Sequence, residues 1–381
     1  MISIEICMHA RRLSLASVAV FSLTSVLTAQ PTQHYKQTNL VSDMPGVAAT
    51  TDPNLVNAWG MSRSSGSPWW ISDNGPGLTT LYTGTGAAVP LGEPCPAGTN
   101  TNCVIIPSGD TSISPAGVPT GQVFNGTTDF QVTPGNPAHF IFVTEDGTIS
   151  AWNGGNTAVI KVNTHSASVF KGVALAIAAT TKGGMANFLY VADFRKGQVN
   201  VYDASFRRVN LNENAFDDEE IPHGFAPFNV QNIGGNLYVA YAQQDSAKHD
   251  EVDGAGLGYV DVYSPSGHLL HRLEHGSWLN APWGMTQAPS DFGANSHNIL
   301  VGQFGSGWIL VFDPVTGKFK GPLYDATNNP IVIDGLWNIA FGGGGTSGPS
   351  TTLFFTAGPN GEKDGLFGTI TAIENVLGGD L

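Results

Sequence analysis

The sequence has few charged residues and few cysteines. Asp, Glu, Lys and Arg make up 12% of the 381 residues, about half of their usual share. Hydrophobic residues make up 41%, so the chain has neither the high charge nor the low hydrophobicity of a disordered protein. The three cysteines show no C-x-x-C spacing, which argues against a structural zinc site. The net charge of −14 disfavours nucleic acid and anionic membranes as partners.

The sequence also lacks the common catalytic motifs. It contains no Gly-x-Ser-x-Gly elbow, no His-Glu-x-x-His and no P-loop. Its histidines are scattered; His268 and His271 are three positions apart in a predicted strand and therefore point to opposite faces. The sequence does not predict a particular reaction, and whether the protein is an enzyme stays open.

The N-terminal hydrophobic run is too short to span a bilayer as a helix. Arg11 and Arg12 precede this run, which extends from Leu13 to Leu27, and Ala29 offers a cleavage site. The pattern predicts a signal peptide over residues 1–29 and a secreted protein, extracellular or periplasmic. The arginine pair leaves both the general and the twin-arginine export routes open.

Removal of this leader would leave two cysteines, Cys95 and Cys103, in a segment rich in Pro, Gly and Asn. In an oxidising compartment we expect them to form a local disulfide that closes an insertion in the first repeat unit. In the cytosol such a pair would instead suggest a redox or metal site, which the predicted leader argues against.

Glycine is abundant, with 48 residues, and six glycines begin a repeated phrase of alternating apolar and polar residues. This period of two predicts a strand with one buried face. Strands that recur at intervals of 49 to 70 residues indicate the blades of a propeller. The six phrases are Gly77–Thr83, Gly147–Asn153, Gly197–Asp203, Gly258–Ser264, Gly307–Asp313 and Gly368–Glu374.

Three further strands accompany each phrase. An apolar strand such as Phe140–Thr144 precedes it as a hairpin partner, and a more polar strand such as Ala158–Val162 follows it. The innermost strands are expected at Ala58–Met61, Asp129–Val132, Val173–Ala176, Phe228–Val230, Trp283–Thr286 and Trp337–Ala340. The sequence therefore predicts an all-β, six-bladed propeller with four antiparallel strands per blade, forming one domain over residues 30–381.

The last unit lacks an outer strand of its own, since only seven residues follow its phrase. The segment Tyr35–Val41 resembles a strand but precedes the first blade. We expect it to complete the sixth blade and so close the ring, which removes a free sheet edge.

In a propeller, the loops that lead into the innermost strands share one face, here named the mouth face, with the hairpins between the two middle strands. Such loops commonly carry function. The predicted mouth-face residues with polar side chains are Asn57, Asp73, Asn74, Glu145, Asp146, Asp193, His223, Asn280, Gln303 and Asp334. Oxygen-bearing side chains in a ring suit a hard cation such as calcium, but Asn and Asp also cap turns. Trp59, Trp283 and Trp337 recur on the innermost strands, where they either pack near the axis or line a ligand site.

One hairpin, in the fourth unit, expands into a long acidic loop over residues 243–256. Asp250, Glu251 and Asp253 are its candidate metal ligands, with His249 added only for a transition metal. The spacing does not match an EF-hand. The alternative is a solvated surface loop that binds nothing.

With these residues in view, the chain resembles an uncharacterised family of secreted bacterial propellers that is distantly related to NHL-repeat proteins. The resemblance rests on Asn54–Met61, Lys248–Gly256, Leu279–Gly284, Ile333–Trp337 and Phe355–Asn360. It implies a six-bladed propeller with no assigned activity. Some members end in a sorting tail, and because this chain ends in Gly-Gly-Asp-Leu381 we expect release.

More distant six-bladed propellers include metal-dependent lactonases and zinc-dependent lyases. No residue-by-residue match to either motif can be made, and fold analogy alone says little about chemistry. Two hypotheses follow: a monomeric module that binds an extracellular small molecule, glycan or protein at the mouth face, or a calcium-type hydrolase or lactonase. A structural role in an envelope assembly is a third.

Overall fold

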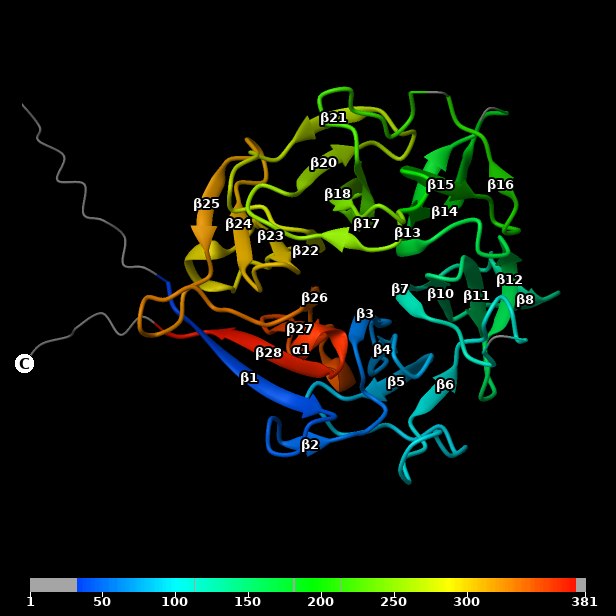
Figure 1. The fold of residues 1–381 in the computed structure, drawn as a ribbon, viewed down its shortest axis with the longest axis horizontal. Helices are drawn as coiled ribbons and strands as arrows, with labels where there is room; N and C mark the ends of the chain where they lie inside the picture. The colour runs from blue at the N-terminus through cyan, green and yellow to red at the C-terminus, as the bar shows by residue number, and fades with distance from the viewer. Residues whose placement is uncertain (1–32, 113, 181, 213, 375–381) are drawn as a thin grey trace, which may run out of the picture. The chain divides into compact units, whose positions relative to one another are not determined.

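The computed structural model describes residues 33–112, 114–180, 182–212 and 214–374. The predicted signal peptide lies outside these residues. The described residues form six β-sheets arranged around a central axis (Figure 1). This confirms the predicted six-bladed propeller with four mainly antiparallel strands in each blade. Among the described residues, no helix is long and apolar enough to cross a membrane.

The six blades follow one another in sequence order, and each runs from an innermost strand near the axis to an outer strand. Blade 1 contains β3 (Ala58–Ser62), β4 (Trp69–Asp73), β5 (Leu78–Tyr82) and β6 (Cys103–Ile105), and blade 2 contains β7 (Pro119–Phe124), β10 (Phe140–Thr144), β11 (Thr148–Trp152) and β12 (Val159–Asn163). Blade 3 contains β13 (Phe170–Ala179), β14 (Met185–Asp193), β15 (Gln198–Tyr202) and β16 (Arg208–Val209), and blade 4 contains β17 (Phe225–Ile233), β18 (Asn236–Gln244), β20 (Tyr259–Tyr263) and β21 (Leu269–Arg272). Blade 5 contains β22 (Pro282–Gln287), β23 (Ile299–Gln303), β24 (Ile309–Phe312) and β25 (Phe319–Pro322), and blade 6 contains β26 (Leu336–Phe341), β27 (Leu353–Ala357), β28 (Leu366–Ala372) and β1 (Tyr35–Ser42).

A few short elements lie outside this pattern. They are β2 (Thr50–Thr51) beside β1, the hairpin of β8 (Gln131–Thr133) and β9 (Asn136–Pro137), β19 (Glu251–Val252) beside β18, the 3-10 turns Gly293–Asn295 and Gly345–Ser347, and α1 (Pro359–Glu362).

The repeated glycine marks a backbone requirement. Gly147 and Gly307 adopt φ of +79° and +69°, the left-handed region that glycine occupies at little steric cost. A Cβ at Gly307 would also lie 2.4 Å from the carbonyl oxygen of Ile333. At this position the glycine therefore permits both the tight hairpin and close contact with the next blade.

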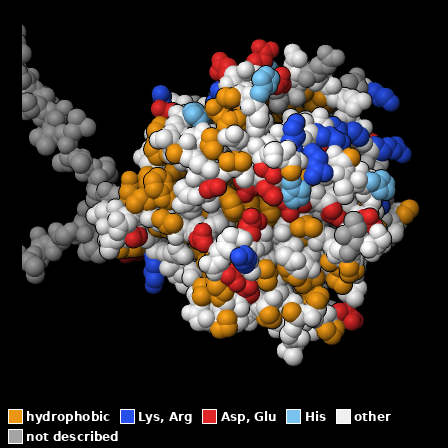
Figure 2. Space-filling model, viewed as in Figure 1, with side chains coloured by type: hydrophobic (Ala, Val, Ile, Leu, Met, Phe, Trp, Pro, Cys, Tyr) orange, Lys and Arg blue, Asp and Glu red, His pale blue; other side chains and the backbone are white. Residues whose placement is uncertain are grey.

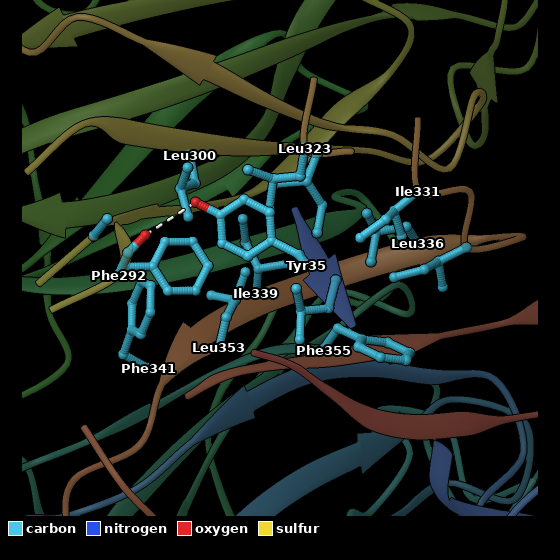
Figure 3. Close-up of a cluster of buried hydrophobic side chains, with 14 of the residues drawn as sticks. Tyr35, Phe292, Leu300, Leu323, Ile331, Leu336, Ile339, Phe341, Leu353 and Phe355 are labelled. Carbon is cyan, nitrogen blue, oxygen red and sulfur yellow. Dashed lines mark hydrogen bonds between the residues drawn. The ribbon is translucent and has the colours of Figure 1, made fainter. Parts of the chain in front are cut away.

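The N-terminal strand closes the ring, as predicted. β1 pairs antiparallel with β28 from Tyr35–Ala372 to Ser42–Leu366, with a bulge near Asn39. The Tyr35 ring is buried among apolar side chains of blades 5 and 6, and its hydroxyl donates to the carbonyl oxygen of Phe292 at 3.0 Å (Figure 3).

The expected innermost strand of blade 2 was wrong. The strand is Pro119–Phe124 rather than Asp129–Val132, part of which forms the separate β8–β9 hairpin. Pro119 and Gly121 disfavour a strand in isolation. Near the axis, however, a Cβ at Gly121 would lie 2.8 Å from the Cα of Gly172 in blade 3. Crowding between neighbouring blades therefore favours glycine where local propensity does not.

All six innermost strands carry a register irregularity at the same point, next to a Gly or Asn. Bulges of this kind redirect a side chain. The residues at this point are Trp59, Thr120, Lys171, Phe228, Trp283 and Trp337. Except for Thr120, these side chains meet one another from five different blades.

The predicted Cys95–Cys103 disulfide is present, with the two Cα atoms 5.8 Å apart. Cys103 is the first residue of β6, so the bridge joins the insertion to an outer strand of blade 1. Because the closed loop is short, replacing both cysteines with alanine should lower the free energy of unfolding by roughly 2–3 kcal/mol. Denaturant unfolding checks this value, and mass spectrometry after non-reducing alkylation should find neither cysteine modified. Two alkylated cysteines would contradict the bridge.

Candidate binding site at the mouth of the central channel

Aromatic side chains fill the propeller axis below the mouth face. Trp59 stacks on Trp337 with ring centroids 3.6 Å apart, and Phe304 stacks on the same ring at 4.2 Å. Trp283 meets both tryptophans edge-on. The three tryptophans are fully buried, so the packing interpretation of the recurrent tryptophans is correct and their rings do not line an open ligand site.

A buried lysine lies directly on this aromatic cluster. The Lys171 side chain is 1% exposed, and its Nζ lies 2.5 Å from Glu145 Oε1 and 3.4 Å from Asp250 Oδ1. The same Nζ is 4.9 Å from the centre of the Trp59 ring, within reach of a cation–π interaction. Burial alone lowers the pKa of Lys171, but Glu145, Glu251 and Asp250 outweigh burial and raise it above its usual value. Lys171 therefore carries its charge at neutral pH.

Four carboxylates from three blades surround this lysine, and we name them the mouth cluster: Glu145, Asp250, Glu251 and Glu362. Glu145 lies in the β10–β11 turn, Asp250 and Glu251 in the loop after β18, and Glu362 at the end of α1. Burial, with a further contribution from Glu362 and Asp250, raises the pKa of Glu251 to about 7 although Lys171 opposes this shift. In the view of Figure 1, acidic side chains gather around the centre of the face (Figure 2).

Two asparagines of blade 1 hold this cluster from the side. Asn57 Nδ2 donates to Glu362 Oε2 at 2.8 Å, and Asn57 Oδ1 accepts from the indole of Trp337 at 2.9 Å. Asn74 Nδ2 donates to Glu145 Oε2 at 3.0 Å. Of the predicted mouth-face residues, Glu145 belongs to the mouth cluster, and Asn57 and Asn74 contact it directly.

The acidic loop is ordered by contacts within the protein. β19 pairs with β18, and the backbone N–H of Gln244 donates to the Gly224 carbonyl, so the loop starts beside the segment that carries His223. His249 Nδ1 lies 2.7 Å from Asp250 Oδ1. This contact raises the pKa of His249 and lowers that of Asp250 to about 2, with help from Lys171 for Asp250.

The predicted metal ligands are only partly brought together. Ligand atoms of Glu145, His249 and Asp250 lie within 4.8 Å of one another. Glu251 lies close enough for the charges of Lys171 and Glu362 to shift its pKa, whereas Asp253 is exposed and lies against Gly305 of blade 5.

Asp193 caps a turn, as the simpler interpretation has it, whereas Gln303, Asn280 and Asp334 accept hydrogen bonds from backbone N–H groups of other segments. Asp193 accepts from the backbone N–H of Lys196 at 3.2 Å and from Asn200 Nδ2 at 3.0 Å. Gln303 Oε1 accepts from the backbone N–H of Asn280 at 2.8 Å. Asn280 Oδ1 in turn accepts from Gly254, and Asp334 Oδ2 accepts from Asn360 at 2.9 Å.

Asp73 and His223 lie apart from the mouth cluster. Asp73 is fully buried inside blade 1, where burial raises its pKa well above the usual value although Thr80 opposes this shift. His223 is exposed and lines a cavity of about 560 Å³ beside the acidic residues 217–220.

Sequence reasoning missed Lys171 and Glu362. A signal for Lys171 was present, because aligning the innermost strands places it where blades 1, 4, 5 and 6 carry an aromatic residue. A lysine at a position that is otherwise aromatic and near the axis would have to be buried and paired. Glu362 gave no such signal, since it lies in a short turn with no counterpart in other blades.

Fold and site together define a six-bladed β-propeller whose axis is closed by aromatic rings beneath a charged mouth. No family model matches the sequence. The chain belongs to the family of two uncharacterised proteins of Acanthamoeba polyphaga mimivirus, R648 and L690. It is 30% identical to R648 over 88% of this chain and 80% of that protein, and 30% identical to L690 over 88% and 85%.

Two solved structures share the fold. One is a structural genomics protein of unknown function from Bacteroides thetaiotaomicron, with a TM-score of 0.52 and 10% identity over 90% of this chain and 76% of the other. The other is a glucose dehydrogenase, with a TM-score of 0.51 and 12% identity over 89% of this chain and all of the other. Propellers of this shape thus include an enzyme and a protein of unknown function.

Proposed function

We propose that this protein is a secreted binding propeller whose mouth cluster recognises a positively charged group on an extracellular small molecule or protein. The observation that carries the proposal is a group of four carboxylates around a single ammonium, that of Lys171. Glu145 and Asp250 lie within ion-pair distance of it, and the charge of Lys171 also opposes the burial that raises the pKa values of Glu251 and Glu362. The ligand class follows from this excess of negative charge. A primary ammonium or a guanidinium fits it, and a guanidinium can bind carboxylates through two parallel hydrogen bonds.

Crowded carboxylates repel one another unless a cation lies among them. Lys171 neutralises Glu145 from below, whereas the upper members of the cluster remain accessible: the Asp250 side chain is 64% exposed, and Glu251 and Glu362 are half-buried. The raised pKa values of Glu251 and Glu362, both due first to burial and then in part to neighbouring carboxylates, are consistent with this repulsion. A bound cation would relieve it.

The second candidate is a metal-dependent hydrolase or lactonase, favoured by the ligand atoms of Glu145, His249 and Asp250. Calcium usually binds six to eight oxygen atoms. Here the Lys171 ammonium already lies 2.5 Å and 3.4 Å from oxygens of Glu145 and Asp250. A divalent ion at the same oxygens would meet this fixed positive charge, so the organic cation is the better candidate.

Calorimetric titration with arginine amide, and separately with calcium chloride, tests the choice. At pH 8, above the pKa of about 7 of Glu251, we expect saturable binding of arginine amide that weakens as sodium chloride is added. The double variant Asp250→Asn/Glu362→Gln should bind at least roughly tenfold more weakly, equivalent to about 1.4 kcal/mol. Glu219→Gln, which changes an exposed glutamate outside the cluster, is the matched control. Stoichiometric calcium binding without arginine amide binding would favour the hydrolase, and binding of neither probe would refute the proposal.

A further inference from the structure

The central channel also opens on the face opposite the mouth, into a cavity of about 570 Å³. Its lining comes from the far ends of the innermost strands of all six blades, including Ser62, Phe124, Asn232, Thr286 and Phe341. Cavities of this volume are typical of small-molecule sites. The aromatic cluster on the axis lies between this cavity and the mouth cluster, so the two sites share no lining residue.

One charged side chain, Arg63, lines the cavity. It is half-buried, burial lowers its pKa, and no carboxylate among the described residues lies within ion-pair distance of it. A partly buried cation without a counter-ion is unfavourable. It is also unexpected in a chain with a net charge of −14, where carboxylates are plentiful.

The surroundings hold the guanidinium in place. Nε and Nη2 of Arg63 donate to the carbonyl oxygen of Phe341 at 3.0 Å and 2.7 Å, and Nη1 donates to the Ser64 carbonyl at 3.4 Å. The guanidinium also lies 5.3 Å from the centre of the Trp69 ring. These bonds use three of the five N–H groups of arginine, which leaves two for a ligand.

The glycine-rich segment that begins at Gly342 makes room for this arrangement. A Cβ at Gly343 would lie 2.1 Å from Nη1 of Arg63. The same segment anchors the ring beneath the guanidinium, because the indole of Trp69 donates to the Ser347 carbonyl at 2.9 Å. This glycine-rich segment therefore builds one wall of the Arg63 environment.

We propose that this cavity binds a small organic carboxylate that also carries hydroxyl groups. Arg63 would bind the carboxylate with its two remaining N–H groups. Gln231 and Thr286 line the cavity with side-chain polar atoms that have no hydrogen-bond partner among the described residues, and they would bind hydroxyl groups. Val173 and Leu175 supply apolar contact on the wall. A single positive charge suits a monoanion better than phosphate, which carries more negative charge near neutral pH.

Calorimetric titration of the purified protein with sodium galacturonate tests this proposal, with galactose as the neutral analogue. We expect saturable binding of galacturonate, and binding of galactose at least tenfold weaker because it lacks the charge that Arg63 recognises. Arg63→Gln should weaken galacturonate binding at least tenfold. Arg207→Gln, which changes an exposed arginine outside the cavity, should have no effect. Binding of arginine amide at the mouth should be the same in both variants.

If Arg63→Gln does not fold, the double variant Gln231→Leu/Thr286→Val supplies the test, because it removes hydrogen-bonding groups from the wall and keeps the charge. It should weaken galacturonate binding several-fold and bring its affinity closer to that of a simple carboxylate such as acetate. Absence of saturable galacturonate binding in the millimolar range would overturn the proposal. Equal binding by wild type and Arg63→Gln, or loss of binding in Asp250→Asn/Glu362→Gln, would also overturn it.

Discussion

A chain that begins at residue 43, and therefore lacks β1, is expected to lose its cooperative thermal unfolding transition. Deletion exposes the edge of β28 and removes the buried side chains of Tyr35 and Val41. Burial of each such side chain contributes about 1.5–3 kcal/mol, and the backbone pairing along β1 is lost as well. Because total stabilities are commonly about 5–15 kcal/mol, this loss is a large share of the whole. Scanning calorimetry measures it.

The matched control is a chain that begins at residue 33 and keeps all of β1. It should unfold cooperatively, and equal melting temperatures for the two chains would refute closure by β1. A milder variant, Tyr35→Ala, keeps the strand but empties its place in the cluster of Figure 3 and should lower stability by about 3–5 kcal/mol. Size-exclusion chromatography should also show association of the chain without β1, because a free strand edge pairs readily with another chain.

Replacing Lys171 with methionine should be the most damaging single change at the mouth. The methionine would fill much of the space but leave Glu145, which is 9% exposed, as a buried carboxylate without its cation. Breaking a buried pair in this way costs about 3–5 kcal/mol. Asp250 would lose the same partner, so residues 245–250 should be cut faster by a protease. Denaturant unfolding and limited proteolysis measure the two effects.

The double variant Lys171→Met/Glu145→Gln distinguishes the effect of the charges from that of side-chain packing. It removes both charges but keeps a side-chain oxygen at position 145 that can accept the hydrogen bond from Asn74. It should recover part of the stability lost in the single variant. Lys196→Met, at an exposed position of the same blade, should leave both measurements unchanged. If Lys171→Met were as stable as wild type, the ion pair would contribute nothing and Lys171 could not be the organising charge of the mouth cluster.

The blade count and the closing strand could be predicted from the sequence because strand patterns and hairpin glycines are local features. In segments such as Gly307–Asp313, apolar and polar residues alternate with period two whatever surrounds the segment. Because no outer strand follows Gly368–Glu374, the sequence also indicated that Tyr35–Val41 completes the sixth blade. The exception was blade 2, where Pro119 and Gly121 hide a strand that packing at the axis requires.

The site depended on tertiary structure to a greater degree. The sequence indicated Asn57 and the acidic loop, but Asn57 meets Glu362 across 305 positions of sequence, and Lys171 meets Asp250 across 79. No local sequence pattern predicts these contacts, because they depend on which blades face one another across the axis. Burial then decides the chemistry: the same lysine on an outer strand would be a solvated charge, whereas at the axis it must be paired. The residue types were therefore set by the sequence alone, while the packing of six blades around one axis decided which of them act together.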